Sequence, residues 1–314
     1  MSQTIVDTLL TGLPLVPAVV GIWMIFRLRA DFDLTIDASF ATGGAVTAAL
    51  LAHGHGVAPT MLAAVAAGGA MGLTTAGLHL LLRVPVLLAG VAMSIGFYSV
   101  DLRIMDTPSI SLLDGDTLFS GFAGLSSDQA DWATIAVLAA IVVALLTALG
   151  LFLRTELGLA LRASGVNERM TRSQGADVRL LLCLSLALAN ALAALSGSLV
   201  VQSDGFADVN MGAGTLVAGI GAVLLGELLL RPTASRIART MAALLAGALA
   251  YRLILVGALR LGLPATDLKA VTALTLVAAI AAERYGRPLF GLVRRRLAPL
   301  AAPLAPGTTA KAGR

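Results

Sequence analysis

The chain has 314 residues, of which 58% are hydrophobic and only 13% charged, and its net charge at pH 7 is +4. A soluble domain of this length could not bury so much apolar surface in one core. Apolar runs near 20 residues recur along the sequence, and about 20 helical residues cross roughly 30 Å of hydrocarbon. The composition therefore predicts an all-α, polytopic bundle of transmembrane helices. The basic residues gather in a few loops and in the tail, so no nucleic-acid partner is expected.

Nine apolar runs are candidate spans, and a count of 8–10 is compatible with the pattern. Asp33 and Asp37 fall at the start of the second run, which could be a broken or partly re-entrant helix. Residues 1–297 are expected to form one transmembrane domain, and the Ala- and Pro-rich segment 298–314 a disordered cytoplasmic tail. The runs cover residues 5–26, 34–52, 58–82, 84–104, 132–153, 180–202, 213–230, 241–259 and 268–283.

Positive charge is distributed unevenly between the connecting loops. Loop 105–131 contains no Lys or Arg and five Asp residues. Most basic segments fall on the opposite face when nine spans are threaded, and basic residues accumulate in cytoplasmic loops. The amino end is therefore expected outside and the carboxyl end inside, in a bacterial cytoplasmic membrane. Arg260 and Lys269 flank an outside turn and are the exceptions. Because no Lys or Arg precedes Arg27, the first run is expected to be a retained span rather than a signal peptide.

Segment 154–179 is the longest stretch with enough charge to lie in water on the cytoplasmic side, with five Arg and three acidic residues. Both halves look helical, with a break around residues 165–167. Glycine tolerates the backbone angles of a turn, and Asn167 can cap the helix that follows. We therefore predict an amphipathic helical hairpin that docks onto a partner at the membrane face.

This segment resembles the cytoplasmic coupling loop of ATP-binding-cassette importer permeases of the branched-chain amino acid and ribose type. The matching positions are Asn167, Glu168, Gly175, Asp177 and Arg179, whereas Arg169-Met170-Thr171 replaces the Glu-Ala-Ala triplet of the general importer motif. The resemblance is strongest to permeases labelled as tryptophan/tyrosine transporters or as uncharacterised importer components. It extends over residues 32–44, 191–199, 205–227, 251–254 and 263–269.

The resemblance implies a permease subunit that forms the translocation path for a small organic solute, with an amino acid-like solute favoured. Two copies of the chain would form the pore as a homodimer above two cytoplasmic ATPase subunits. An extracytoplasmic solute-binding protein would deliver the solute, and the chain itself would be neither an enzyme nor bound to a cofactor. The hairpin residues expected to contact the ATPase are Arg162, Gly165, Asn167, Glu168, Arg169, Arg172, Gly175 and Asp177.

Polar groups at membrane depth are costly and so mark candidate pathway residues. A glycine-rich start to the run 213–230 could present free N–H groups to an anionic head group. The structural alternative is that Asp37 or Glu227 pairs with Arg252, and Asp33 is expected to cap its helix. The candidates for the path are Asp37, Ser39, Thr42, Asn190, Gly214, Thr215, Glu227 and Arg252.

Other functions remain open at this point. An ion-coupled secondary transporter would use Asp37, Glu227 and Arg252 as a relay without an ATPase. A permease working in export is a further alternative. A membrane enzyme is disfavoured because no catalytic set, phosphate-binding loop or metal-ligand spacing is present. His53 and His55 are read as a solvated turn rather than a metal site, and Cys183 as a core residue.

Overall fold

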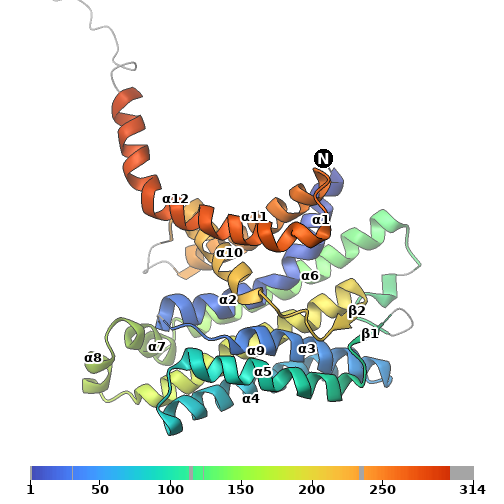
Figure 1. The fold of residues 1–314 in the computed structure, drawn as a ribbon, viewed down its shortest axis with the longest axis horizontal. Helices are drawn as coiled ribbons and strands as arrows, with labels where there is room; N and C mark the ends of the chain where they lie inside the picture. Colours follow the sequence, from blue (N-terminus) through green and yellow to red (C-terminus); the bar gives the residue numbers. More distant parts are fainter. Residues whose placement is uncertain (1, 30, 113–115, 123, 233–236, 298–314) are drawn as a thin grey trace, which may run out of the picture.

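The computed structural model describes residues 2–29, 31–112, 116–122, 124–232 and 237–297, and most of them are helical (Figure 1). Short 3-10 or π-helical segments are η1 (Leu13–Leu15), η2 (Met24–Arg29), η3 (Ser120–Phe122) and η4 (Ala265–Asp267). The α-helices are α1 (Ser2–Gly12), α2 (Val16–Trp23), α3 (Thr35–Ala52), α4 (Val57–Leu82), α5 (Val86–Met105), α6 (Ser127–Phe152), α7 (Glu156–Val166), α8 (Glu168–Ser173), α9 (Val178–Asp204), α10 (Thr215–Leu230), α11 (Ile237–Arg260) and α12 (Leu268–Leu297).

Among the described residues, seven helical stretches are long and apolar enough to cross a membrane. Two further apolar helices, Thr215–Leu230 and Leu268–Ala282, are shorter. Large side chains on the outer helices are exposed, such as Leu81 at 83% and Ile95 at 70%, as lipid-facing positions would be. The all-α polytopic bundle is thus confirmed, whereas the count of nine spans and the orientation stay predictions.

Several element boundaries differ from the sequence prediction. The first stretch, Gln3–Arg29, is interrupted at η1. Pro14 and Pro17 have no amide hydrogen to donate within a continuous helix, and they lie near the starts of η1 and α2, where this hydrogen is not needed. Helix α6 begins five residues before the expected start, and α12 continues past residue 283 to Leu297. The predicted disordered tail, 298–314, lies outside the described residues.

Helices α3, α4, α5 and α9 form one group, in which α9 packs most extensively against α4 and α3. Small residues bring these backbones into contact. A Cβ atom added to Gly72 would overlap with Leu186 O, and one added to Gly68 would lie 2.5 Å from Asn190 O. Such positions accept only glycine, because a side chain would force the helices apart.

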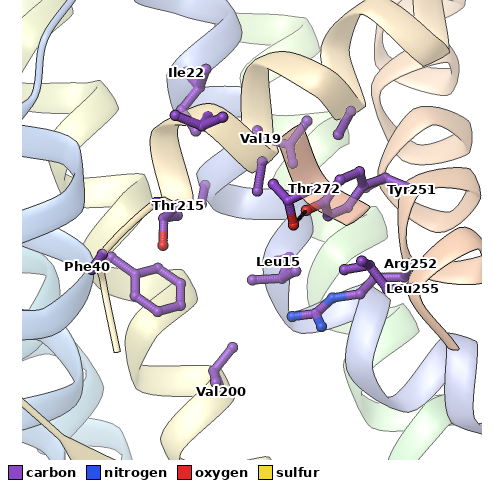
Figure 2. Close-up of a pocket in the computed structure, with 18 of the residues that line it drawn as sticks. Leu15, Val19, Ile22, Phe40, Val200, Thr215, Tyr251, Arg252, Leu255 and Thr272 are labelled. Atoms are coloured by element: carbon purple, nitrogen blue, oxygen red, sulfur yellow. Dashed lines mark hydrogen bonds between the residues drawn. The ribbon is translucent and has the colours of Figure 1, made fainter. Parts of the chain in front are cut away.

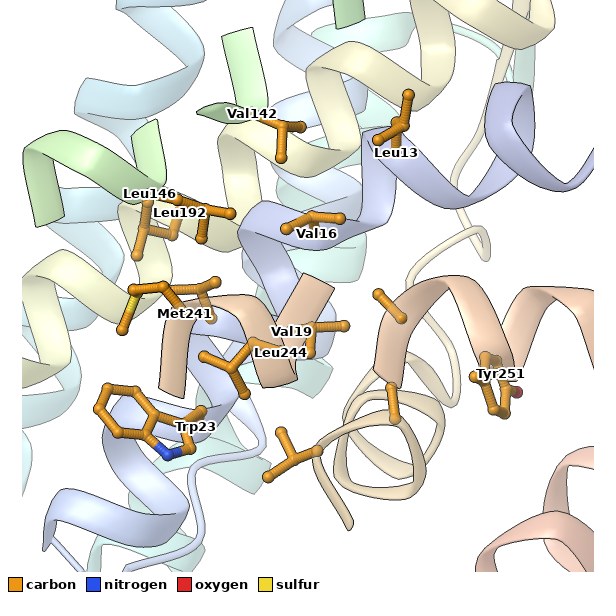
Figure 3. Close-up of a cluster of buried hydrophobic side chains, with 14 of the residues drawn as sticks. Leu13, Val16, Val19, Trp23, Val142, Leu146, Leu192, Met241, Leu244 and Tyr251 are labelled. Atoms are coloured by element: carbon orange, nitrogen blue, oxygen red, sulfur yellow. The ribbon is translucent and has the colours of Figure 1, made fainter. Parts of the chain in front are cut away.

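Helices α10, α11 and α12 form a second group on the other side of α2 (Figure 1). A cluster of buried apolar side chains joins α2, α6, α9 and α11 (Figure 3). Its fully buried members include Val16, Leu138, Leu199 and Leu244. Helix α2 is therefore packed between the two groups.

Helix α10 begins part-way along its neighbours rather than at an end of the bundle. Two three-residue strands, β1 (Ser109–Ser111) and β2 (Phe206–Asp208), pair antiparallel, and they were not foreseen by the all-α prediction. From β2 the chain runs through turns along α3, where a Cβ on Gly212 would overlap with Asp37 O. Gly214, with φ +90, then starts α10 beside the first turn of α3. The predicted span 213–230 is thus a 16-residue helix, roughly 24 Å long, preceded by turns.

Candidate functional site

A cavity of about 570 Å³ lies between the two helix groups, beside the start of α10 (Figure 2). Its wall is mainly apolar, and Figure 2 shows Phe40 of α3 on one side and Leu255 of α11 on the other. Leu15 and Val19, near and on α2, lie between them. Concave, mostly apolar sites with a few convergent polar groups are typical of small-molecule binding.

Charged groups of both signs line the same cavity. Arg252 of α11 is half-buried, its guanidinium points into the cavity in Figure 2, and its buried Nε has no hydrogen-bond partner. Asp204, the last residue of α9, and Lys269 of α12 are both exposed lining residues. Tyr251 Oη lies 2.8 Å from Thr272 Oγ1. The cavity can therefore receive a solute that carries a carboxylate, an ammonium group, or both.

The end of the cavity nearest η2 is closed. A Cβ atom on Gly219 of α10 would overlap with Ile22 Cδ1, so these two helices touch. Further along, Arg27 of η2 forms an ion pair with Glu227 of α10, in which Arg27 Nε donates to Glu227 Oε1 at 2.9 Å. Asp204, which precedes β2 by two residues, and Lys269 are exposed members of the same cavity wall.

Asp37 does not pair with Arg252. Its carboxylate accepts hydrogen bonds from the backbone N–H of Gly214 at 3.1 Å and of Leu216 at 2.7 Å. Asp37 therefore caps α10 from the neighbouring helix α3, where negative charge is favoured. The expectation that these N–H groups are free for an anionic head group is wrong, because Asp37 already occupies them. Glu227 pairs with Arg27, so neither carboxylate forms the expected pair with Arg252.

Asn190 and Ser39 belong to a buried polar network rather than to the cavity wall. Asn190 Nδ2 donates to Asp33 Oδ2 at 2.8 Å, and Ser39 Oγ donates to Asn190 Oδ1 at 2.7 Å. Asp33 Oδ1 accepts from the backbone N–H of Thr35, the first residue of α3, at 2.8 Å, although the N-cap position of this helix is Leu34. Thr42 is also buried and does not line the large cavity. Of the eight candidates, Gly214, Thr215 and Arg252 line that cavity.

The polar segment 154–179 forms two helices, as predicted, at the end of the bundle opposite β1 and β2 (Figure 1). Asn167 Oδ1 accepts from Met170 N at 3.0 Å and so caps α8. Asp177 Oδ1 accepts from Arg179 N at 2.9 Å at the start of α9, and Gly175 has φ +84 in the connecting turn. The side chains of Glu168, Arg169 and Arg172 are exposed on this hairpin, and Arg162 is half-buried.

The hairpin rests on η2. A Cβ atom on Gly165 would overlap with Leu28 O, so Gly165 serves close approach rather than the turn that the sequence suggested. Arg29 contacts Ser164 Oγ at 3.2 Å and Glu168 Oε1 at 3.3 Å. Because η2 continues directly from α2, the hairpin is connected by one helical stretch to the cavity wall.

Phe40, Asp204 and Lys269 were missed as candidates. Lys269 had a sequence signal, because it is an exception to the distribution of positive charge. Asp204 follows an apolar run and reads as part of an acidic loop, and Phe40 has no distinguishing signal. Their common position at one cavity depends on the tertiary arrangement of α3, α9 and α12, which are far apart in the sequence.

A helical bundle with a helix that begins beside an internal cavity is typical of membrane transport proteins. Residues 4–281 match the family described as branched-chain amino acid transport system / permease component, and the chain belongs to that family. The tyrosine transport system permease protein of Clostridioides difficile (strain R20291) is 32% identical over 261 residues, covering 83% of this chain and 85% of that protein. An uncharacterized protein of Rickettsia prowazekii (strain Madrid E) is 31% identical over 223 residues, covering 71% and 76% respectively. No solved structure matches the chain significantly.

Proposed function

We propose that residues 1–297 form the permease subunit of an ATP-binding-cassette importer in a bacterial cytoplasmic membrane, and that the large cavity binds an amino acid-like solute. The observation that carries the proposal is the arrangement of Arg252, Asp204 and Lys269 around one apolar cavity. In this reading Arg252 holds the carboxylate, Asp204 receives the ammonium group, and the wall around Phe40 accommodates an apolar or aromatic side chain. The tyrosine label of the Clostridioides relative is compatible with such a solute.

Energy would reach the cavity through the hairpin α7–α8. Its exposed residues would fit a groove in a separate ATPase subunit, which carries out ATP hydrolysis. Movement of the hairpin would be passed through the Gly165–Leu28 contact to η2 and α2. The contacts Ile22–Gly219 and Arg27–Glu227 would then separate and open the closed end of the cavity. A second copy of the chain and an extracytoplasmic binding protein would complete the importer.

The ion-coupled alternative finds less support. Asp37, Glu227 and Arg252 would have to exchange a proton or ion, yet Asp37 caps α10 and Glu227 pairs with Arg27. Uptake that survives a protonophore and stops on ATP depletion would support the importer. Uptake with the reverse dependence would favour the secondary transporter.

The proposal is tested by replacing Arg252 and measuring ATP-dependent uptake of labelled tyrosine, leucine and ribose by the assembled importer. Arg252→Gln is expected to lower uptake of the amino acids by roughly 10- to 100-fold, because a charge-assisted hydrogen bond contributes about 1.5–3 kcal/mol. The matched control is Arg260→Gln on the same helix, since Arg260 is exposed and pairs with Asp7 at 2.7 Å. Unchanged uptake in Arg252→Gln would contradict the assignment of the cavity.

A further inference from the structure

A second, smaller cavity of about 220 Å³ lies between α3, α5 and the turns that precede α10. Ala213 and Gly214 line both cavities, so this backbone segment separates them. The lining of the small cavity is rich in oxygen atoms, and none of its described residues is basic. Its polar side chains are Asp37, Ser94, Tyr98, Asp101 and Asn210.

Asp101 of α5 is a buried carboxylate without a counter-charge in this cavity. The residue is 1% exposed, and its Oδ1 has no hydrogen-bond partner. The Thr42 hydroxyl of α3 is a neighbour of this carboxyl, but Thr42 Oγ1 and Asp101 Oδ1 do not form a hydrogen bond of acceptable geometry. An ionised carboxylate in such a place is costly unless something positive compensates it.

The two carboxylates of the cavity are not equivalent. Asp37 is compensated by the amino end of α10, because it accepts hydrogen bonds from Gly214 N and Leu216 N. Asp101 is therefore the carboxyl group of this cavity whose negative charge, when it is ionised, nothing compensates, and one monovalent cation would balance that charge. Carboxylate, hydroxyl and amide oxygens are the ligands that hard cations prefer, and the volume leaves room for a small ion with some of its water.

We propose that the cavity formed by Asp101, Tyr98, Asn210 and Asp37 binds a small monovalent cation. The ligand is either a free ion such as Na⁺ or the ammonium group of an organic molecule, which share the same chemistry toward Asp101. Because the cavity borders the turns at the start of α10, the bound cation would hold α5 against this segment. Binding requires neither an ATPase nor transport, so the proposal can fail without affecting the proposed function.

The test is the thermal unfolding midpoint of the purified full chain in detergent, titrated at constant ionic strength. The salts are NaCl, methylammonium chloride and the bulky N-methyl-D-glucamine chloride as the reference. We expect a saturable rise of the midpoint with Na⁺ or methylammonium over the reference, and the salt that acts identifies the source of the positive charge. The same midpoint in all three salts would overturn the proposal without the need for any variant.

Variants locate the effect. Asp101→Asn is expected to abolish the saturable rise, whereas the control Asp106→Asn is expected to keep it, because Asp106 is exposed at the end of the same helix and Asn tolerates its positive φ of 57. Tyr98→Phe removes one lining hydroxyl and should raise the half-saturating concentration several-fold, which provides a second variant should Asp101→Asn fold poorly. A rise in Asp101→Asn equal to that of the unmodified chain would overturn the site.

Discussion

At Gly165 the backbone of α7 touches the backbone of η2, and the missing side chain is what permits this contact. The sequence analysis also singled out this residue, but predicted a turn there, because a glycine between two helical segments usually indicates a turn. Asn190 was likewise marked as a pathway residue. Its partners Asp33 and Ser39 are 157 and 151 positions away, and only the packing of α3 against α9 brings them together.

Gly165→Ala should impair coupling, although alanine normally stabilises a helix relative to glycine by about 0.5–1 kcal/mol. The added methyl group would overlap with Leu28 O, so α7 must shift away from η2. We expect lower ATP-dependent uptake together with a lower unfolding midpoint. Gly77→Ala on α4 is the matched control, since no atom lies within 4 Å of the added Cβ, and it should leave both quantities unchanged or raise the midpoint. Normal uptake in Gly165→Ala would argue against transmission through this contact.

Helix α10 is the element for which the sequence pattern predicted least of the observed structure. The glycine-rich run before it correctly indicated a helix start near residue 214. An apolar run of 18 residues cannot reveal, however, that its first two residues end a series of turns, nor that Asp37 of another helix caps the helix that follows. Irregular backbone at membrane depth is tolerated where it lines a cavity, and both cavities border this segment.

Asp37→Ala should destabilise the chain by about 0.5–2 kcal/mol, because two N–H groups at the start of α10 lose their acceptor. Asp37→Asn keeps an uncharged acceptor and should fall between Asp37→Ala and the unmodified chain. Chemical or thermal unfolding in detergent measures the difference. Asp128→Ala serves as the control, since Asp128 is exposed in the first turn of α6 and should contribute only a few tenths of a kcal/mol. Identical midpoints for Asp37→Ala and Asp128→Ala would disprove the capping role.

On the scale of the whole molecule, the hairpin α7–α8 and the strands β1 and β2 lie at opposite ends of the bundle, joined by the length of α9 (Figure 1). This arrangement agrees with the sequence prediction that segment 154–179 and loop 105–131 face opposite sides of the membrane. The proposed mechanism requires the hairpin to lie on the cytoplasmic side, because the proposed ATPase subunits lie there.

The orientation can be tested by labelling single cysteines in intact cells with a membrane-impermeant maleimide, after Cys183→Ala removes the native thiol. Ser173→Cys, on the exposed surface of α8, should react only after the membrane is permeabilised. Ser126→Cys, exposed just before α6, should react without permeabilisation. The opposite pattern of labelling would reverse the topology and with it the coupling role of the hairpin.

The sequence by itself determined the helical membrane class, most helix positions, the two-helix hairpin with its Asn167 cap, and the resemblance to the family. These properties depend on local composition, on apolar periodicity and on capping by near neighbours, all of which involve residues close together in the sequence. The tertiary structure alone decided that Arg252, Asp204 and Lys269 share a cavity, that Asp37 caps α10, and that Asp101 is buried without a counter-charge. The reason is physical: the partner of a polar group in a membrane bundle lies on another helix, and helix-to-helix contacts depend on packing rather than on sequence distance.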